Sequence, residues 1–565
     1  MPTARRRLLA TVGALLLGLA LALLGGAAPA GAHATLQDTS PADDALVDVV
    51  PDDVVLRFDE PVSASTGAVQ VISPGGDRVD GAVDDIDGGR ALAIGVDGDA
   101  RGTYTVAYRV VSDDGHTITG SFVFHVGERT GAATIDQSIP TVTSAVGGVG
   151  RWLGYAGAAV AVGAALLLAL LRRGGAGSAD PPTGAALSRL GTLVVAGAAA
   201  SALGTAAAVV AQTATTTGRS LGGALALVTE VAGDSRPVAV ALLRAAVLVG
   251  AALVGGAGRA RRLPAVLVAT GAVVAGAGLL APVAGHPWTA DPRALAVPAD
   301  ALHLLAASVW LGLLVALVVA APSLPDPDRA VRLVSGSALV AAGVVAVTGT
   351  TSGWLLLGSI DALTQTASGQ LVMLKAVGFG LLVALGWINR ARLVPLLGRV
   401  VAPAPDADAD ADTSAPSARP AAVARRRLLQ LVRAEVVVGA LVLAVTAGLV
   451  NQPPGRDTLA QPYADVRTDE ALQLRLEVEP AQAGDNTMHV YLTDTDGRPV
   501  RFDALEVRVS REGIPARKLD GVTPISPDHA SVYGASLPTP GTWTVEVTTV
   551  TLSTTAQFSF EVPVR

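Results

Sequence analysis

The chain has 565 residues, several times the ~100–200 residues of a typical domain, so we expect more than one domain. Half of the residues are apolar, 16% are charged and the mean hydropathy is +0.50, which excludes a wholly soluble protein and is typical of a membrane protein with polar appendages. A formal net charge of -7 without a concentrated basic face argues against nucleic acid as a partner, and the absence of cysteine excludes disulfides, thiolate metal sites and cysteine nucleophiles.

The N-terminus predicts a secretory signal peptide over residues 1–32. A basic ARRR stretch precedes an apolar run over residues 8–24, and small residues end in an A-x-A motif at 30–32. Cleavage there makes His33 the first residue of the mature chain. An N-terminal histidine can bind one metal ion through its α-amine and its ring, because an α-amine with a pKa of about 7.7–8.0 deprotonates readily near neutral pH. The alternative is that this histidine follows the cleavage site by coincidence.

Residues 33–130 predict a small antiparallel β-sandwich or barrel. Apolar and polar residues alternate in stretches such as DVVLRFDEPV, GTYTVAYRVVS and GSFVFHV, which Gly, Pro and Asp clusters separate. Asp114 and His116 flank Gly115 in the turn VSDDGHTITG, so both side chains can converge on His33 if this loop closes over the N-terminus. One amine, two imidazoles and one carboxylate suit Cu(II) in a tetragonal plane. The alternative is a hairpin turn with a solvated histidine.

Two stretches of this segment, HATLQDTSPADDALVDVVPDDVVLRFDEPV and GTYTVAYRVVSDDGHTITGSFVFHV, resemble the CopC family of extracytoplasmic copper-binding proteins. The resemblance implies that His33, Asp114 and His116 are Cu(II) ligands, with Glu60 as a nearby carboxylate. Some family members also carry a methionine-rich Cu(I) site. None of the chain's three methionines lies in this segment, so we expect a Cu(II)-only domain. We expect His125 to face outward from its strand and not to bind metal.

Residues 149–455 predict a polytopic membrane domain of about eight helices. The apolar runs are each about 20 residues long, enough to span a ~30 Å hydrocarbon core. They occupy residues 149–171, 189–211, 236–257, 263–285, 297–321, 333–357, 370–392 and 428–450. If the first β domain is outside, the inner loops hold most of the arginines of this region, as the positive-inside rule requires, and the C-terminus returns outside. The tract 401–424 is rich in Pro, Ala and Asp and predicts a disordered cytoplasmic loop.

Two histidines in this region are candidate metal-binding residues. His286, in AGHPW, and His303, in ALHLLAASVWLGLL, stand at the end of one predicted helix and the start of the next, near the outer surface. They could face each other across a short loop and receive a metal from the domain above. Burying a polar group at membrane depth costs free energy, so such groups are often functional, although the cost is lower for a histidine at the interface. Arg244, Lys375 and Glu435 also fall within or near spans, where each either snorkels or pairs with a neighbour.

The stretches HLLAASVWLGLL, GQLVMLKAVGFGLLVALGWINRARLVP and RAEVVVGALVLAVTAGLVNQPPGR resemble the CopD family of membrane proteins associated with copper uptake and resistance. Fusion of the two modules in one chain is a known arrangement of that family. One departure is TASGQLVMLK, where an aromatic residue before the glycine would be more typical.

Residues 465–565 return to strand alternation and predict an immunoglobulin-like β-sandwich. Turns recur near the 8–12 residue spacing of such folds, and the segment resembles the β-sandwich tails of related copper membrane proteins. Met488 and His489 are adjacent, so they point to opposite faces of a strand. Although they could form a second metal site with His529, we expect all three to be ordinary surface or turn residues.

These patterns predict a copper-binding protein of the plasma membrane that is not an enzyme. Its outer β domain captures Cu(II) and its helical domain receives the copper for import, homeostasis and resistance. Its partners are the copper ion, the lipid bilayer and a copper-receiving membrane or cytoplasmic partner. Two alternatives stay open: a histidine-brace copper redox enzyme at the N-terminus, and a haem-binding electron carrier with His286 and His303 as axial ligands. No phosphate-binding loop or Walker-type lysine is present, so we do not expect ATP-driven pumping.

Overall fold

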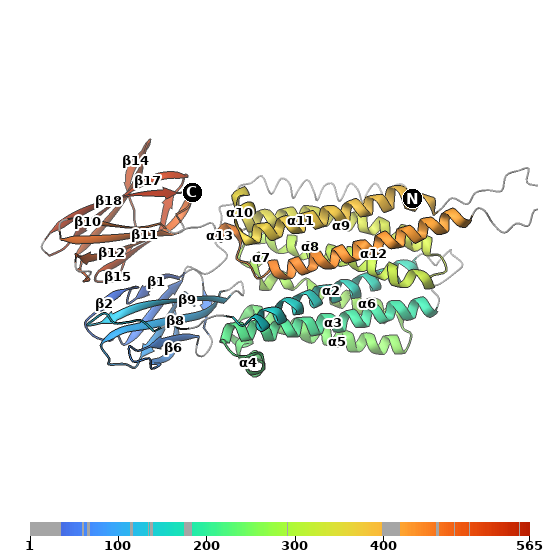
Figure 1. The fold of residues 1–565 in the computed structure, drawn as a ribbon, viewed down its shortest axis with the longest axis horizontal. Helices are drawn as coiled ribbons and strands as arrows, with labels where there is room; N and C mark the ends of the chain where they lie inside the picture. The colour runs from blue at the N-terminus through green and yellow to red at the C-terminus, as the bar shows by residue number, and fades with distance from the viewer. Residues whose placement is uncertain are drawn as a thin grey trace, which may run out of the picture. The chain divides into compact units, whose positions relative to one another are not determined.

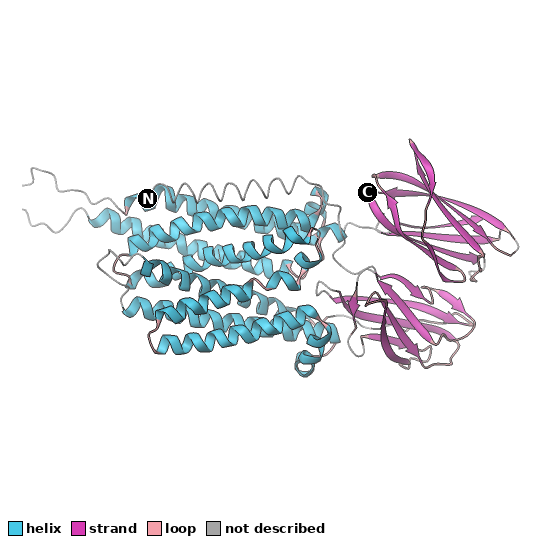
Figure 2. Cartoon of the chain, turned by 180° about the vertical axis from the view of Figure 1, so that it is seen from behind, coloured by secondary structure: helices cyan, strands magenta, loops and turns pink. Residues whose placement is uncertain are grey.

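The structure is a computed structural model that describes residues 36–564 apart from short internal stretches. These stretches are residues 59–60, 65–67, 113–116, 134, 136–138, 174–183, 291, 398–417, 459–462, 470, 480, 496–497 and 553. Two compact units make up the chain, a helical unit and a β unit (Figure 1, Figure 2). The helical unit includes residues 140–213 and 221–455, and the β unit residues 31–139, 214–220 and 456–565.

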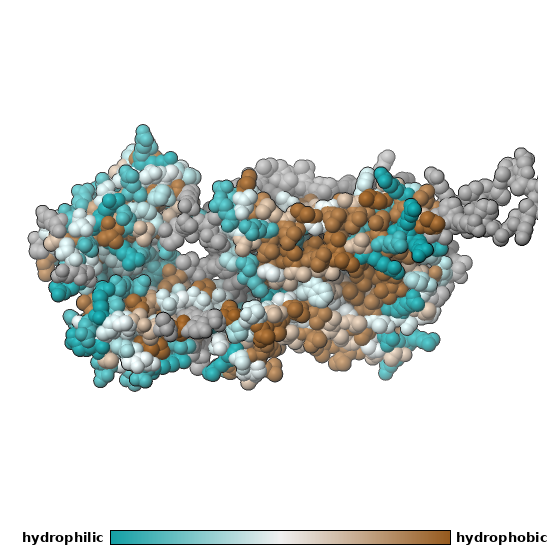
Figure 3. Space-filling model, viewed as in Figure 1, coloured by the Kyte–Doolittle hydropathy of each residue, from teal (hydrophilic) through white to brown (hydrophobic). Residues whose placement is uncertain are grey.

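Eight helices among the described residues are long and apolar enough to cross a membrane, which is the predicted number. They are α2 (Thr141–Arg173), α3 (Gly184–Thr217), α5 (Arg236–Ala260), α6 (Pro264–Gly278) together with the following η2 (Ala281–Ala284), α8 (Arg293–Ala320), α9 (Pro327–Leu357), α11 (Ala367–Ile388) and α12 (Ala418–Leu449). The shorter helices are α4 (Leu221–Asp234), α7 (His286–Thr289), α10 (Ile360–Gln365) and α13 (Gly455–Thr458). Apolar side chains cover the middle of the helical unit and polar ones gather at its ends (Figure 3). This distribution fits a bundle whose flanks face lipid, where only helices satisfy their own backbone.

Two predicted segments differ from, or lie outside, the described structure. The signal peptide at 1–32 lies outside the described residues. The 401–424 loop lies outside them up to residue 417, and α12 begins at Ala418. The end of the predicted disordered loop is therefore helical, because alanines and arginines there favour a helix that continues into the last apolar run.

The N-terminal part of the β unit consists of two sheets that share one apolar core. One sheet has the order β1 (Leu36–Ser40), β3 (Asp53–Phe58), β7 (Ala91–Val96), β6 (Asp80–Ile86). The other has the order β2 (Ala45–Val47), β9 (Thr117–Val126), β8 (Gly102–Ser112), β4 (Val62–Ser63), with β5 (Val69–Ile72) also on β8. Leu56 and Ile94 from the first sheet and Tyr104 and Phe124 from the second are in the core. The predicted β-sandwich is confirmed, with one parallel pair, β2 and β9.

The C-terminal part of the β unit is a second sandwich with its own core. Its sheets have the orders β10 (Tyr463–Asp469), β11 (Leu472–Glu479), β12 (Gly484–Asp494), β16 (His529–Leu537), β15 (Val522–Ser526) and β14 (Ile514–Lys518), β13 (Ala504–Arg511), β17 (Gly541–Val550), β18 (Thr555–Val564). In β18 every second residue is buried, as the alternation in AQFSFEVPV predicts. Trp543, Phe558 and Phe560 from one sheet meet Met488 and Val490 from the other in the core.

His125 faces away from the core, as predicted, but it is not exposed. Its flanking residues Phe124 and Val126 are in the core, while the His125 side chain is only 5% exposed. Its Nδ1 lies 2.8 Å from Thr103 Oγ1 and its Nε2 lies 2.8 Å from Asp44 Oδ1. Both ring nitrogens therefore have protein partners, and the histidine ties β8 and β9 to the turn before β2.

Glycines let α2 approach α8 at backbone distance. A Cβ atom on Gly312 of α8 would lie 1.8 Å from the carbonyl oxygen of Ala159 on α2, and one on Gly163 would lie 2.0 Å from the Gly312 carbonyl carbon. Small residues at such crossings are the usual means by which membrane helices gain close packing without a hydrophobic driving force. This crossing explains why a bundle with so few aromatic residues can still have a dense interior.

We expect Gly312→Ala to destabilise the helical unit, because no rotamer moves a Cβ away from backbone. Overpacked cores lose about 1–3 kcal/mol, and a clash with a carbonyl lies at the upper end of that range or beyond. Thermal unfolding of the purified protein in detergent measures the effect. Gly276→Ala is the matched control, since a Cβ there meets no atom within 4 Å. An unchanged unfolding temperature for Gly312→Ala would show that the close crossing does not exist.

Candidate functional site

The residues predicted to bind Cu(II), His33, Glu60, Asp114 and His116, all lie outside the described residues. The strands that lead to them are described. Leu36, where β1 starts, pairs with Phe58, where β3 ends, and Val62 of β4 pairs with Ser112, where β8 ends. Phe58 and Val62 are four positions apart in the chain, so these strand ends belong to one end of the sandwich. The segments that carry the four residues therefore start from a common edge.

His303 lies further into the helical unit than the sequence predicted. Because α8 begins at Arg293, His303 is about 15 Å along the helix from its start. The half-buried ring lies with its Nδ1 3.1 Å from Thr348 Oγ1 on α9. The neighbouring Gly349 provides the space, since a Cβ there would lie 3.0 Å from His303 Cε1. A hydroxyl partner and a glycine thus fix this imidazole between two helices.

Ionisable side chains of α8 and of three further helices interact electrostatically with one another in this part of the helical unit. The Asp300 carboxylate, one turn before His303, attracts the Lys375 ammonium of α11. Tyr155 of α2 interacts with Asp300 and with Arg244 of α5, and Arg244 Nε donates to the Ala277 carbonyl, 3.0 Å away. Arg244 and Lys375 therefore pair with neighbours, the second of the two roles predicted for them. We call the set the His303 cluster; its members are Tyr155, Arg244, Asp300, His303, Thr348 and Lys375.

His286 begins the short helix α7, before α8. Two residues later, the Trp288 ring lies between the guanidinium groups of Arg236 and Arg293, each 4.5 Å from the ring centroid. These cation–π contacts fix α7 against the starts of α5 and α8. The two candidate histidines thus occupy different settings, His286 in the connection between helices and His303 well inside α8.

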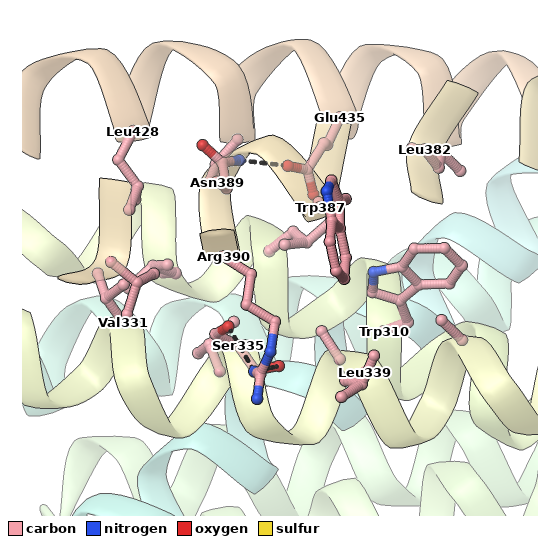
Figure 4. Close-up of a pocket in the computed structure, with 18 of the residues that line it drawn as sticks. Trp310, Val331, Ser335, Leu339, Leu382, Trp387, Asn389, Arg390, Leu428 and Glu435 are labelled. Carbon is pink, nitrogen blue, oxygen red and sulfur yellow. Dashed lines mark hydrogen bonds between the residues drawn. The ribbon is translucent and has the colours of Figure 1, made fainter. Parts of the chain in front are cut away.

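Glu435 is buried on α12 beside a cavity of about 120 Å³ (Figure 4). The Asn389 side-chain amide, at the start of η4 (Asn389–Leu393), donates a hydrogen bond to Glu435 Oε1. Arg390 points to the opposite wall, where its Nη1 donates to the Ser335 carbonyl and hydroxyl oxygens at 3.2 and 3.1 Å. Glu435 therefore pairs with a neighbour and does not snorkel. Apolar residues, including Trp310, form most of the remaining lining.

His489 and His529 are buried, so the expectation of surface or turn residues is wrong. Their exposed fractions are 1% and 0%, and they lie beside Asp38 of β1, which is 3% exposed. Burial lowers the pKa of His489 to about 4. Burial and the charge of His489 lower the pKa of His529 to about 3, and burial raises the pKa of Asp38 to about 7 against the opposing charge of Arg57. Both imidazoles are therefore neutral at pH 7.

Asp38, Asp300 and Tyr155 were not predicted from the sequence. Asp300 had a visible signal, because it is a carboxylate inside an apolar run and stands three residues before a histidine, on the same helical face. Tyr155 and Asp38 had none. A tyrosine in an apolar run is ordinary, and an aspartate in a predicted strand reads as a surface residue.

Comparison with known proteins identifies two parts of the chain. A family model of the CopC domain matches residues 36–127, and one of copper resistance protein D matches residues 328–449. The curated relative "Copper transport protein CutJ" of Bacillus subtilis (strain 168) is 24% identical over 535 residues, which cover 91% of this chain and 93% of that protein. These names denote copper transport and resistance proteins, not enzymes.

Two solved structures are similar to a small part of this chain. The crystal structure of CopC from Methylosinus trichosporium OB3b is 28% identical and covers 18% of this chain and 100% of its own, with a TM-score of 0.16. That of PcoC, a methionine-rich copper resistance protein from Escherichia coli, is 25% identical and covers 17% of this chain and 98% of its own, with a TM-score of 0.15. The resemblance predicted from the sequence is confirmed: the chain carries a CopC domain and a copper resistance protein D domain in one polypeptide and is homologous to a copper transport protein over 91% of its length.

Proposed function

We propose that this multi-pass membrane protein captures Cu(II) at the extracytoplasmic face and passes the copper to its helical unit for import, homeostasis and resistance. The observation that carries the proposal is the His303 cluster, an imidazole among paired charges inside an apolar bundle. Burying an ionisable group in a membrane costs free energy, so such groups usually serve a transport pathway or stabilise the fold. In a chain with two copper-resistance domains, a copper pathway is the simplest use for them.

The capture site consists of His33, Asp114 and His116, with Glu60 nearby. In support, the strands that flank these residues start from one end of the sandwich. The α-amine of His33, two imidazoles and a carboxylate favour Cu(II) over metals that prefer oxygen or thiolate ligands. The site requires cleavage of residues 1–32, because only a free α-amine completes it.

In this proposal both β domains, residues 33–130 and 465–565, are extracytoplasmic. Along the sequence they precede and follow a membrane domain at 149–455. The positions of the arginines support this orientation. Because successive helices cross the membrane in opposite directions, the helix ends where the arginines gather all lie on one side. These arginines are Arg172, Arg173, Arg189, Arg259, Arg261, Arg262, Arg329, Arg332, Arg390, Arg392, Arg425, Arg426 and Arg427. By the positive-inside rule that side is cytoplasmic.

Transfer requires a membrane site that binds copper and releases it again. Thr348 holds His303 Nδ1, which leaves Nε2 as the ring nitrogen for a metal. Asp300, one turn away on the same face of α8, supplies a carboxylate oxygen. Lys375 neutralises Asp300 when copper is absent and repels the ion when it arrives. Two ligands next to a competing cation make a weak site, as a relay needs.

One extra alanine before His33 tests the capture site. The extension keeps every side chain but moves the α-amine, so we expect Cu(II) affinity at this site to fall at least tenfold, about 1.4 kcal/mol. EPR of the purified full-length protein during a Cu(II) titration measures the loss of the nitrogen-rich signal. An extension that leaves the signal and the affinity unchanged would exclude His33 as a bidentate ligand.

A pair of glycine variants on α9 tests the role of His303. Gly349→Ala places a Cβ 3.0 Å from the His303 ring, whereas Gly343→Ala on the same helix meets no atom within 4 Å. We expect Gly349→Ala and His303→Ala to lower copper uptake by cells at limiting copper at least about tenfold, equivalent to 1.4 kcal/mol in the barrier. Gly343→Ala should transport at the wild-type rate, and all three should keep the N-terminal EPR signal. Equal uptake by Gly349→Ala and Gly343→Ala would remove His303 from the pathway.

A further inference from the structure

We propose that Asp38, His489 and His529 form a second, fully buried copper site in the β unit, separate from the His33 site. The three residues each present one potential ligand atom, and these atoms lie within 4.8 Å of one another. Two imidazoles and one carboxylate suit Cu(II) and Zn(II), and Cu(II) binds more tightly to such a set. The proposal needs neither a free N-terminus nor the His303 cluster, so it is independent of the proposed relay.

The two histidines come from neighbouring strands of one sheet. In the antiparallel register of β12 and β16, His489 is opposite Ser531 and His529 is opposite Tyr491. The imidazoles are therefore diagonal neighbours on one sheet face, with ring centroids 5.6 Å apart. The alternate residues Met488 and Val490 point into the sandwich core, so the histidines are on the outer face of the sheet. Imidazoles on the outer face of a sheet are normally exposed to solvent, yet both of these are buried.

Asp38 of β1 supplies the third ligand. Its Oδ1 lies 3.2 Å from His529 Nδ1. Metal–ligand bonds of about 2.0–2.2 Å place neighbouring ligand atoms roughly 3 Å apart. This pair therefore already has the spacing of two ligands on one ion. One ligand atom of His489 also lies within 4.8 Å of a ligand atom of each of the other two residues.

Four polar atoms of the cluster are buried without a hydrogen-bond partner. They are both carboxylate oxygens of Asp38, Nε2 of His489 and Nδ1 of His529. An unsatisfied buried polar atom destabilises the folded state, and native structures contain few. A simple ion pair between Asp38 and His529 does not remove this penalty, because burial disfavours the charged form of both groups. One metal ion would satisfy atoms of all three residues at once.

Neighbouring side chains orient the two rings as an outer shell does in metal sites. Ser531 Oγ lies 2.9 Å from His489 Nδ1 and 3.5 Å from His529 Nε2. The Tyr491 ring stacks on His529 with centroids 4.1 Å apart and 21° between the planes. The Ser531 hydroxyl thus contacts one nitrogen of each ring. The other two nitrogens, His489 Nε2 and His529 Nδ1, have no hydrogen-bond partner and remain for a metal.

The test counts Cu(II) equivalents in the full-length protein that carries the extra alanine before His33, so that the capture site is weakened throughout. In this background we compare His529→Gln and Asp38→Asn with His125→Gln. The His125 variant is the matched control, because that histidine is buried in the same unit but both its ring nitrogens have protein partners. Cu(II) titration with EPR and with thermal unfolding gives two readouts, since a ligand that binds only the folded state raises the unfolding temperature.

We expect His529→Gln and Asp38→Asn each to lose one Cu(II) equivalent and the Cu(II)-dependent rise in unfolding temperature, while His125→Gln keeps both. Loss of the equivalent in only one variant, with the other folded and unchanged, would overturn the three-residue site. So would equal Cu(II) binding in all variants, or a site that takes Zn(II) but not Cu(II). If the alanine extension changes nothing in the wild type while His529→Gln removes an equivalent, the capture proposal fails and this one holds.

Discussion

The contact between Gly312 and the Ala159 carbonyl sets the geometry of the helical unit. Gly163 of α2 and Gly312 of α8 have no side chains, so the two helices approach at backbone distance. Side chains that precede the two glycines in α2 and α8 can therefore reach one another. Tyr155 precedes Gly163 by eight positions and Asp300 precedes Gly312 by twelve, and these two side chains interact. The same crossing that packs the bundle therefore assembles part of the His303 cluster.

Low dielectric surroundings decide what the buried polar groups in both units can do. In the helical unit two buried carboxylates have a partner nearby: Asp300 has the Lys375 ammonium and Glu435 has the Asn389 amide. Pairing of this kind makes ionised groups tolerable away from water. In the β unit four polar atoms of Asp38, His489 and His529 have no hydrogen-bond partner. The first arrangement suits passage of a cation, whereas the second suits its retention.

The chain thus combines three different settings for histidine. His125 has protein partners on both ring nitrogens and ties strands together. His303 has a hydroxyl partner on Nδ1 and a glycine beside its ring, so it is held in place between two helices. His489 and His529 share Ser531 on one side and each leave a nitrogen unpartnered on the other. Residue type alone does not separate these roles; the partners of each ring nitrogen do.

Local patterns in the sequence were sufficient for the secondary structure and the domain identity. Eight apolar runs became eight long helices, because backbone groups in lipid must be satisfied within their own segment. Alternation predicted the strands and put Met488 and His489 on opposite faces, because the period of a strand is two residues. In the structure Met488 is the core residue and His489 is on the outer face. Only the tertiary structure showed that this outer face is buried and that it lies beside Asp38, from a strand far away in the sequence. Likewise, Asp300 and Lys375 meet because α8 and α11 pack in one bundle, and no spacing along the chain encodes that contact.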